Sequence, residues 1–560
     1  MRVPRKFRFP HWPSGRKSGR TVATLTSLYA ILPMGSTNAW MPTTSPGYFP
    51  WSKHSVIQFQ NSRRLVSSNI FGLEPTEQEA GMKQDAVNIL QSGIDAVDPY
   101  TAIRTHFRRH DNMIIVGENS LDLDDYDDII LVAFGKASSA MATSAIKQLN
   151  GQPGMKTPKI SGLVICKDDH ATTHEQRVLE ETGIPIRYAA HPVPDERSSQ
   201  AAQDLLALVE ETASPATLVL CCISGGGSAL FCRPRPPLTL PDLQQTNSIL
   251  LRSGMGIQDM NVIRKRLEDG KGGRLAAASH PSTVVTLVLS DVLGDPLDLI
   301  ASGPTVPDRS TCEDAWKLVQ RNNIKDELPA NVRQVIEDGA NSNLEDSPSP
   351  EHPVFQKSLT VLVGNNDLAV EAAAAKADKL GYNVKILGSQ VEGEAKEIAH
   401  MYVAMALYLQ QRQEKPSSSP YAIASSLPVA LIAGGETTVS LPSNNVGKGG
   451  RNQELALSAA LQLESLGLRN VVVASVGTDG TDGPTDAAGA VVDATTVSGD
   501  TAAAEKAISN HDAYTYFSGF SSIGNGSSDV MPPLIKTGPT GTNVADVCVT
   551  LVHSRCSAKY

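Results

Sequence analysis

The chain has 560 residues, of which 41% are hydrophobic and 19% are charged, so it can form the cores of two or three domains. Its formal net charge of -10 disfavours an open nucleic-acid-binding surface. The charge is unevenly distributed, because residues 1–73 contain ten Lys or Arg and no Asp or Glu, which leaves 39 basic and 59 acidic residues in the rest.

The basic segment 1–73 is predicted to be a targeting presequence, because a basic, hydroxyl-rich and acid-free composition is typical of an organelle transit peptide. Within it, residues 21–39 are mostly apolar or small and end before Trp40, as in a signal-peptide cleavage region. We expect import into a mitochondrion or plastid; the alternative is a disordered tail on a cytoplasmic protein. Polar residues interrupt the apolar stretch and no later stretch is long enough to span a bilayer, so no stable membrane insertion is expected.

After the presequence, residues 76–96 have the pattern of an amphipathic helix. Strand-like runs then alternate with helical segments, and the clearest strands are 129–134, 217–223, 283–289 and 360–363. Continuous apolar strands between helices predict a mostly parallel sheet that is covered on both faces. The segment 76–413 is therefore predicted to be a Rossmann-like α/β/α domain.

Two polar segments, residues 341–353 and 414–427, interrupt the alternation of strands and helices and are predicted to be exposed loops or insertions. Beyond the second, strands at 429–433, 471–476 and 546–552 are separated by long Gly/Thr/Asn loops, with a helix centred on 453–466. We predict a linker at 414–428 and a smaller mixed α/β domain at 429–555.

Several first-domain strands end in loops of small and charged residues. Asp291 follows the strand 283–289 and stands near glycines, which suits a metal-bound phosphate at the carboxyl end of a parallel strand. Lys136 stands where a strand passes into a helix, a position that favours an anion, although a solvated surface lysine would fit equally well. The glycine-rich loop 224–228 is predicted to hold an anion through its backbone N–H groups.

Other polar residues of the first domain allow two interpretations. Arg264 and Lys271 lie at helical spacing near a Gly-Gly turn, where they could meet phosphate or belong to a solvated helix face. His191 lies in a proline-bounded turn and is either a substrate ligand or a structural residue.

The second domain holds four loops that mix glycines with polar or charged residues, namely 434–438, 447–454, 477–483 and 537–543. One such loop would indicate a turn, whereas four in a small domain predict a cleft for a polar ligand. Their spacing does not itself identify that ligand.

Taken together, these loops resemble the class II glycerate kinases, whose C-terminal part is the MOFRL domain. The resemblance covers residues 79–551, and the motifs include Phe134-Gly135-Lys136-Ala137, Ser224-Gly225-Gly226-Gly227-Ser228, Ser290-Asp291-Val292, Ser302-Gly303-Pro304-Thr305, Gly434-Gly435-Glu436-Thr437, Gly450-Arg451-Asn452-Gln453-Glu454, Gly477-Thr478-Asp479-Gly480 and Thr540-Gly541-Thr542-Asn543.

The resemblance implies an ATP- and Mg²⁺-dependent kinase that phosphorylates D-glycerate in a cleft between the two domains, with 2-phosphoglycerate as the favoured product. It is compatible with a homodimer. The implied catalytic residues are Lys136, Asp291, Arg451 and Asp479. The implied substrate-binding residues are Lys136, Arg264, Lys271, Glu436, Arg451 and Asn543. The implied nucleotide-binding residues are Ser224, Gly225, Gly226, Gly227, Ser228, Ser302, Gly303 and Thr305. Asp291 and Asp479 are the implied metal ligands, and which of them orients the attacking hydroxyl stays open.

Two alternatives remain. The first is a hydroxypyruvate reductase, which needs a nicotinamide, yet the chain lacks the G-x-G-x-x-G pattern between a strand and a helix. The second is a nucleotide- or metabolite-binding protein without catalysis. It predicts the loss of acidic positions, whereas Asp291, Glu436 and Asp479 are all present.

Overall fold

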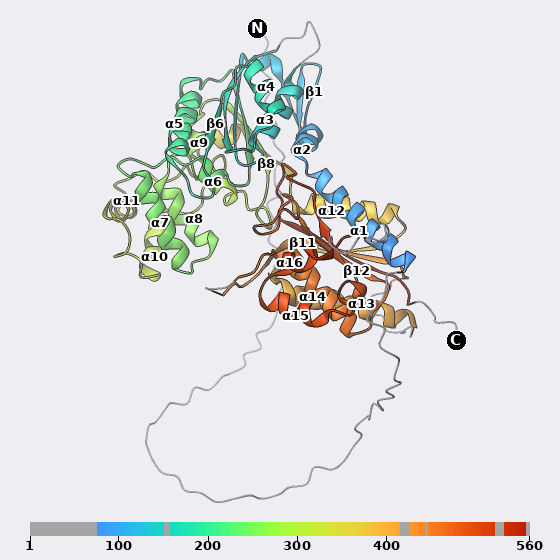
Figure 1. Cartoon of the computed structure of the whole chain (residues 1–560). Helices are drawn as coiled ribbons and strands as arrows, with labels where there is room; N and C mark the ends of the chain where they lie inside the picture. Colours follow the sequence, from blue (N-terminus) through green and yellow to red (C-terminus); the bar gives the residue numbers. More distant parts are fainter. Residues whose placement is uncertain (1–75, 151–156, 415–425, 443–445, 521–530, 556–560) are drawn as a thin grey trace, which may run out of the picture. The chain divides into compact units, whose positions relative to one another are not determined.

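The structure is a computed structural model that describes residues 76–150, 157–414, 426–442, 446–520 and 531–555 (Figure 1). The predicted presequence at 1–73 lies outside these residues, as does most of the predicted linker at 414–428. Two six-stranded sheets organise the described part of the chain. None of its helices is both long and apolar enough to cross a membrane.

The first sheet is entirely parallel, with the strand order β6-β5-β4-β7-β8-β9. Its strands are β4 (Asp128–Phe134), β5 (Lys159–Lys167), β6 (Ile186–Ala189), β7 (Thr217–Ser224), β8 (Thr283–Leu289) and β9 (Ser358–Gly364). This confirms the predicted Rossmann-like sheet.

Helices cover both faces of this sheet because side chains alternate along each strand. Ile129 and Leu131 of β4 pack with α3 (Ser138–Leu149), whereas Ile130 and Val132 pack with α5 (Glu196–Glu211). Both faces of β4 are apolar, which explains the continuous hydrophobic run in its sequence.

Smaller elements surround the first sheet. They are α2 (Pro99–His106), β1 (Phe107–His110), β2 (Met113–Val116), β3 (Asn119–Asp122), α4 (Thr173–Glu181), α6 (Gly227–Leu230) and α9 (Arg274–Ala278). Four helices, α7 (Leu240–Arg252), α8 (Ile257–Leu267), α10 (Cys312–Arg321) and α11 (Ala330–Ala340), share a separate apolar core. Figure 1 shows these four gathered in one group.

The second sheet is mixed, with the order β10-β11-β15-β12-β13-β14, in which only the β10–β11 pair is parallel. Its strands are β10 (Asn383–Glu394), β11 (Val429–Thr438), β12 (Val471–Gly477), β13 (Gly489–Val492), β14 (Leu534–Ile535) and β15 (Asp546–Val552). The fold class predicted from the sequence, a parallel α/β domain followed by a mixed α/β domain, is confirmed.

Helices α1 (Glu77–Ala96) and α12 (Asn366–Lys379) pack on one face of the second sheet, and α13 (Ala395–Glu414) and α14 (Arg451–Ser465) pack on the other (Figure 1). Two short helices, α15 (Thr501–Ser509) and α16 (Ala513–Ser518), follow β13. The second sheet and the helices packed on it therefore include α1, α12, β10 and α13. These elements all precede the domain boundary at 414–428 that the sequence suggested.

Ion pairs hold α1 on the second sheet. Glu79 completes a capping box with Thr76 and also accepts from Arg469 Nη2 at 2.6 Å. Lys83 pairs with Asp493 at 3.0 Å, and both side chains are buried. A helix that the sequence placed with the first domain is therefore held on the second sheet by buried charge.

Candidate active site

The first group of predicted site residues lies where β4, β7 and β8 end. These three strands are neighbours in the sheet and run parallel, so their carboxyl ends meet at one edge. Lys136 follows β4, the loop 224–228 ends β7, and Asp291 follows β8. The loops after β4 and β7 are joined, because Lys136 N donates to Gly225 O at 2.9 Å and Ala137 N donates to Ser224 Oγ at 3.0 Å.

The glycines of the β7 loop let charged side chains approach the backbone. A Cβ on Gly225 would lie 2.0 Å from Asp291 Oδ2, so any side chain there would displace the carboxylate. Gly226 has a φ of 80°, and a Cβ there would lie 2.9 Å from His191 Cδ2 and 3.4 Å from Lys136 Cγ. Lys136, His191 and Asp291 therefore surround this loop.

The same loop presents free donors. Among the described residues, the backbone N–H groups of residues 225–228 donate to no protein acceptor. Successive N–H groups that point out of a turn form an anion site, and a neighbouring lysine strengthens it. The geometry is compatible with the anion site expected from the sequence, which stays a prediction.

Burial and Lys136 set the protonation of the neighbouring side chains. Burial raises the pKa of Asp291, and Lys136 partly offsets this effect. Burial, then repulsion from Lys136 and Lys167, lowers the pKa of His191 to about 4. His191 is therefore neutral near pH 7, and Asp291 accepts a proton more readily than an exposed aspartate would.

Lys271 has a supporting position rather than an open one. Its side chain is 3% exposed, pairs with Glu268 at 2.6 Å, and donates to Ser228 O at 2.9 Å. Arg264 donates from Nε to Asn247 Oδ1 at 2.8 Å. The structure therefore places Lys271 behind the glycine loop, where it holds the loop backbone.

Among the predicted nucleotide-binding residues after β8, Ser302 contacts the glycine loop. Ser302 Oγ lies 3.0 Å from Ser228 Oγ, and Gly303 O accepts from Gly273 N at 2.7 Å. Thr305 is buried and accepts from Thr286 of β8 at 3.0 Å. Ala301 and Ser302 have φ values of 49° and 62°, a left-handed backbone that costs non-glycine residues about 1–3 kcal/mol each.

A second group of site residues lies at the start of α14, where Arg451 is held by two carboxylates. Arg451 Nε and Nη2 donate to the two carboxylate oxygens of Asp546 at 2.6 and 2.9 Å, and Nη1 lies 2.9 Å from Glu436 Oε1. One edge of the guanidinium is therefore occupied by Asp546. A substrate carboxylate would have to bind the other edge, where Glu436 competes with it.

Asn452 and Asp482 extend this network. Asn452 Nδ2 donates to Asp546 at 3.1 Å and to Asp482 at 3.2 Å. Asp482 also accepts from the backbone N–H groups of Asn452 and Gln453, so it caps the N-terminus of α14. Burial raises the pKa of Asp482 to about 6, against the opposing effect of these N–H groups.

A pocket of about 530 Å³ opens beside Arg451, and Glu436, Glu454 and His511 are among its lining residues. His511 Nδ1 lies 2.9 Å from Glu454 Oε2. The pocket has room for a small hydroxy acid.

Asp479 and Asn543 lie in two loops that are joined to each other. Thr540 Oγ1 donates to Thr478 O at 2.6 Å, and Thr540 N donates to Asp479 O at 3.4 Å. Asp479 Oδ1 accepts from Thr481 N at 3.0 Å, and Asn543 Oδ1 accepts from Ala545 N at 3.2 Å. Within the described ranges, no hydrogen bond or ion pair links these two residues to Lys136 or Asp291.

A Mg²⁺ ion commonly uses one or two protein carboxylates together with phosphate oxygens and water. The part of the chain that the structure describes holds no cluster of three or more acidic, His or Cys side chains able to bind a metal. Asp291 and Asp479, as single carboxylates in glycine-rich loops, fit the first pattern and not an all-protein cage.

Two acids of the second group were missed by sequence reasoning. Asp546 begins the apolar strand β15, and its side chain is 8% exposed. A carboxylate at that position needs a buried partner, which was the available signal. Asp482 was within a predicted loop but had no assigned role.

Comparison with known proteins places these groups in a family. Residues 85–337 match a domain of unknown function, DUF4147, and residues 429–546 match the MOFRL family. The D-glycerate 2-kinase of Thermotoga maritima is 38% identical, with 84% of this chain and 98% of that protein covered. The chain belongs to the class II glycerate kinase (MOFRL) family.

A solved relative shares the fold, and another relative carries a different name. The crystal structure of the Thermotoga maritima glycerate kinase is 35% identical, with a TM-score of 0.68, and covers 84% of this chain and 99% of that one. A protein of Agrobacterium vitis that carries the provisional name hydroxypyruvate reductase is 35% identical, over 76% of this chain and 99% of its own length. Family membership and fold are thus those that the motifs predicted.

Proposed function

We propose that this protein transfers the terminal phosphate of ATP to the 2-hydroxyl of D-glycerate in a Mg²⁺-dependent reaction. Family membership and the name of the Thermotoga maritima relative support glycerate as the substrate. The observation that carries the proposal is the β7 loop, whose free N–H groups lie beside Lys136 and Asp291.

Phosphoryl transfer depends mainly on positioning and charge neutralisation. In the proposed reaction, the N–H groups of residues 225–228 hold phosphate oxygens, and Lys136 adds a positive charge beside them. Lys271 and Ser302 hold the loop in place from behind.

Asp291 is proposed to accept the proton of the glycerate hydroxyl. Its carboxylate touches the glycine loop, and burial raises its pKa, which makes it a better base than an exposed aspartate. A bound Mg²⁺ would supply charge neutralisation to the phosphate oxygens. Asp479, which is half-buried, is proposed as its ligand.

Arg451 and Asn543 are proposed to bind the glycerate carboxylate and its second hydroxyl. Arg451 and Glu436 both line the 530 Å³ pocket, and the pair with Asp546 keeps the guanidinium in one orientation. An arginine that is pre-oriented in this way loses little side-chain entropy when it binds a carboxylate.

The test is product analysis by NMR after incubation of the full chain with ATP, Mg²⁺ and D-glycerate. Phosphorus coupled to C2 would support the proposal. Coupling to C3 would keep the kinase and overturn the 2-hydroxyl assignment. No phosphoglycerate from folded protein that binds ATP would favour a binding protein without catalysis.

A reductase is the second candidate because one relative bears that name. It predicts that hydroxypyruvate oxidises NADH or NADPH in the presence of the protein. We expect no change in nicotinamide absorbance, and turnover comparable with the kinase assay would replace the kinase proposal.

The presequence is proposed to direct the protein to a mitochondrion or plastid, on the basis of the acid-free composition of residues 1–73. A fluorescent protein fused after residue 75 should enter one of these organelles, and a signal confined to the cytosol would contradict the proposal. The homodimer is a proposal that light scattering on purified protein would test.

A further inference from the structure

A second pocket, of about 790 Å³, lies away from the glycine loop between α5, α9 and the segment 345–352. Three arginines, Arg233, Arg235 and Arg274, line it together with Asp269. Its apolar lining comes from residues such as Leu206 and Ala278. The proposed reaction uses none of these residues.

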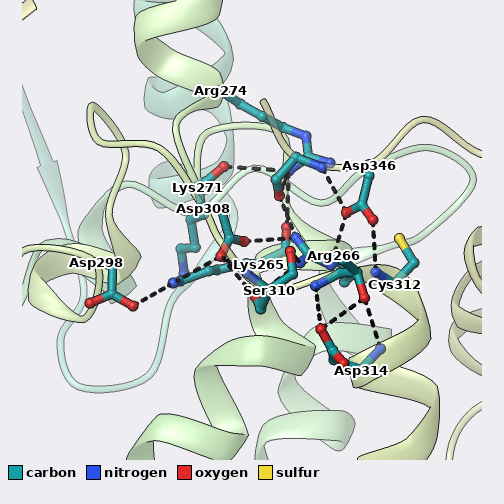
Figure 2. A network of polar contacts seen from close by, with 12 residues as sticks. Lys265, Arg266, Lys271, Arg274, Asp298, Asp308, Ser310, Cys312, Asp314 and Asp346 are labelled. Atoms are coloured by element: carbon teal, nitrogen blue, oxygen red, sulfur yellow. Dashed lines mark hydrogen bonds and ion pairs between the residues drawn. The ribbon is translucent and has the colours of Figure 1, made fainter. Parts of the chain in front are cut away.

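The segment 345–352 forms one wall and is held firmly. Ser347 accepts from Arg274 Nη1 at 2.8 Å and from Arg266 Nη1, and Asp346 lies 3.3 Å from Arg266 Nε. Arg266 is 1% exposed and also pairs with Asp308 at 2.8 Å. Figure 2 shows this network, with Arg266 between Asp308 and Asp346. This wall of the pocket is therefore preformed.

The arginines are incompletely paired. Arg274 Nη2 is a buried donor with no hydrogen-bond acceptor among the described residues. The Arg233 side chain makes no hydrogen bond or ion pair within the same set of residues. Arg235 donates to Glu345 O at 3.0 Å and lies 4.0 Å from Asp269. Since a buried guanidinium N–H normally finds an acceptor, Arg274 Nη2 has capacity for an anionic ligand.

The acidic lining residues do not cancel this charge. Glu210 and Glu345 are exposed at the rim, and Asp346 is occupied by Arg266 and by Cys312 N at 2.9 Å. Asp269 is left as the inner carboxylate facing three arginines. Burial, followed by repulsion from Arg235 and Arg266, lowers the pKa of Arg274 to about 10, which agrees with uncompensated positive charge around it.

We propose that this pocket binds a small phosphate monoester, with the phosphate on Arg233 and Arg274 and the organic part against Leu206 and Ala278. The planar fork of arginine matches phosphate oxygens, and the hydroxyl of Ser347 adds a donor. The pocket is much larger than a phosphate ion and has room for an organic group attached to the phosphate. The apolar lining favours an esterified phosphate over the free ion.

Binding there would reach the glycine loop through direct bonds. Arg274 begins α9 immediately after Gly272 and Gly273, whose N–H groups donate to Ser302 O at 3.0 Å and Gly303 O at 2.7 Å. Lys271, which immediately precedes Gly272, donates from Nζ to Ser228 O in the glycine loop. A ligand on Arg274 is therefore expected to alter the affinity for ATP at the loop.

The test is calorimetric titration with glycerol 3-phosphate and, separately, with inorganic phosphate. Both are titrated into full-length Lys136→Ala protein, in which anion binding at the glycine loop is weakened. Glycerol 3-phosphate should bind about tenfold more tightly than inorganic phosphate. Adding Arg233→Gln should weaken its binding by at least about tenfold, the loss expected for one charge-assisted pair.

Two further variants make the result specific. Ala207→Glu adds a negative charge to the pocket without removing an arginine and should also weaken binding. Arg321→Gln removes an exposed arginine of α10 outside the pocket and should leave binding unchanged. Equal affinity for the two phosphates, or unchanged binding in folded Arg233→Gln and Ala207→Glu proteins, would overturn the proposal.

Discussion

The two groups of site residues differ in how fully their polar atoms are paired. In the glycine loop after β7, the N–H groups of residues 225–228 have no acceptor within the described chain, and Asp291 is close to the backbone without a salt bridge. At the start of α14, Arg451 is held by Asp546 and Glu436. The first group has capacity left for a ligand, whereas the second is largely satisfied by the protein.

This difference predicts different consequences of mutation. Groups that a ligand completes contribute little to the stability of the free protein, because their burial costs free energy. Groups that the protein completes contribute to stability and position a substrate indirectly. Variants in the first group should lose activity without unfolding, and variants in the second should lose stability as well.

The largest effect is expected for Asp291→Asn. Removing a general base typically lowers kcat by about 10²–10⁴-fold, and no salt bridge is lost. The free energy of unfolding should stay within about 1 kcal/mol of the wild type. Steady-state kinetics and urea unfolding check both parts. Full activity in the asparagine variant would show that the glycine loop, and not this carboxylate, carries the catalytic effect.

A smaller loss of activity is expected for Gly225→Ala, because the added Cβ would lie 2.0 Å from Asp291 Oδ2 and would displace the carboxylate. Displacement of a reacting group by about 1 Å can lower the rate by about 100-fold. Gly81→Ala is the control, since a Cβ on that helical glycine of α1 meets nothing within 4 Å. The comparison is of kcat at saturating ATP, and equal rates for the two variants would place Asp291 away from the reacting atoms.

Much of the fold followed from the sequence, because buried parallel strands are continuous apolar runs. The predicted strands 217–223 and 283–289 correspond to β7 and β8 almost residue for residue. Among the strands without a prediction are β5, which contains Gly162 and begins with polar residues, and β10, an edge strand that is only half-buried. The buried apolar run of β5 is short, from Leu163 to Cys166, and the pattern of β10 is weak because this strand lies at the edge of its sheet.

The sequence predicted the loops of the site better than it predicted which side chains form ion pairs there. Glycine-rich loops after strands indicated the cradle at residues 224–228, and the structure brings Lys136 and Asp291 to it. The sequence could not show that Lys271 is buried against Glu268, or that Asp546 occupies one edge of Arg451. Such pairs join residues that are distant in the chain or depend on burial, and hydrophobic periodicity carries no information about them.

For the second group, Asp546→Asn is expected to lower the free energy of unfolding by about 2 kcal/mol. Removing one partner of a fully buried ion pair lowers the free energy of unfolding by more than about 2 kcal/mol. The expected loss is smaller here because Arg451 is 34% exposed, so water can partly replace the carboxylate. Glu436→Gln removes the 47% exposed partner of the same arginine and should cost less than about 1 kcal/mol. Urea unfolding of both variants measures the difference, and equal stability would mean that the buried carboxylate is not the stronger restraint.

A further effect is a pH dependence of stability that comes from Asp482. Burial raises its pKa to about 6 in the folded protein, above the value of about 3.9 for an unfolded aspartate. The protonated form is thus favoured by folding. Its contribution is complete below about pH 4 and is lost as the pH rises through about 6, by an amount on the order of 3 kcal/mol.

Asp482→Asn should therefore flatten the decline in unfolding free energy between about pH 4 and 6, while the exposed Asp500→Asn should keep the wild-type slope. Urea unfolding at several pH values in this interval measures the slope. An unchanged slope in Asp482→Asn would mean that the N–H groups of Asn452 and Gln453 keep Asp482 ionised in the folded state. The second group would then be fully charged at the start of α14, and its contrast with the open first group would become sharper.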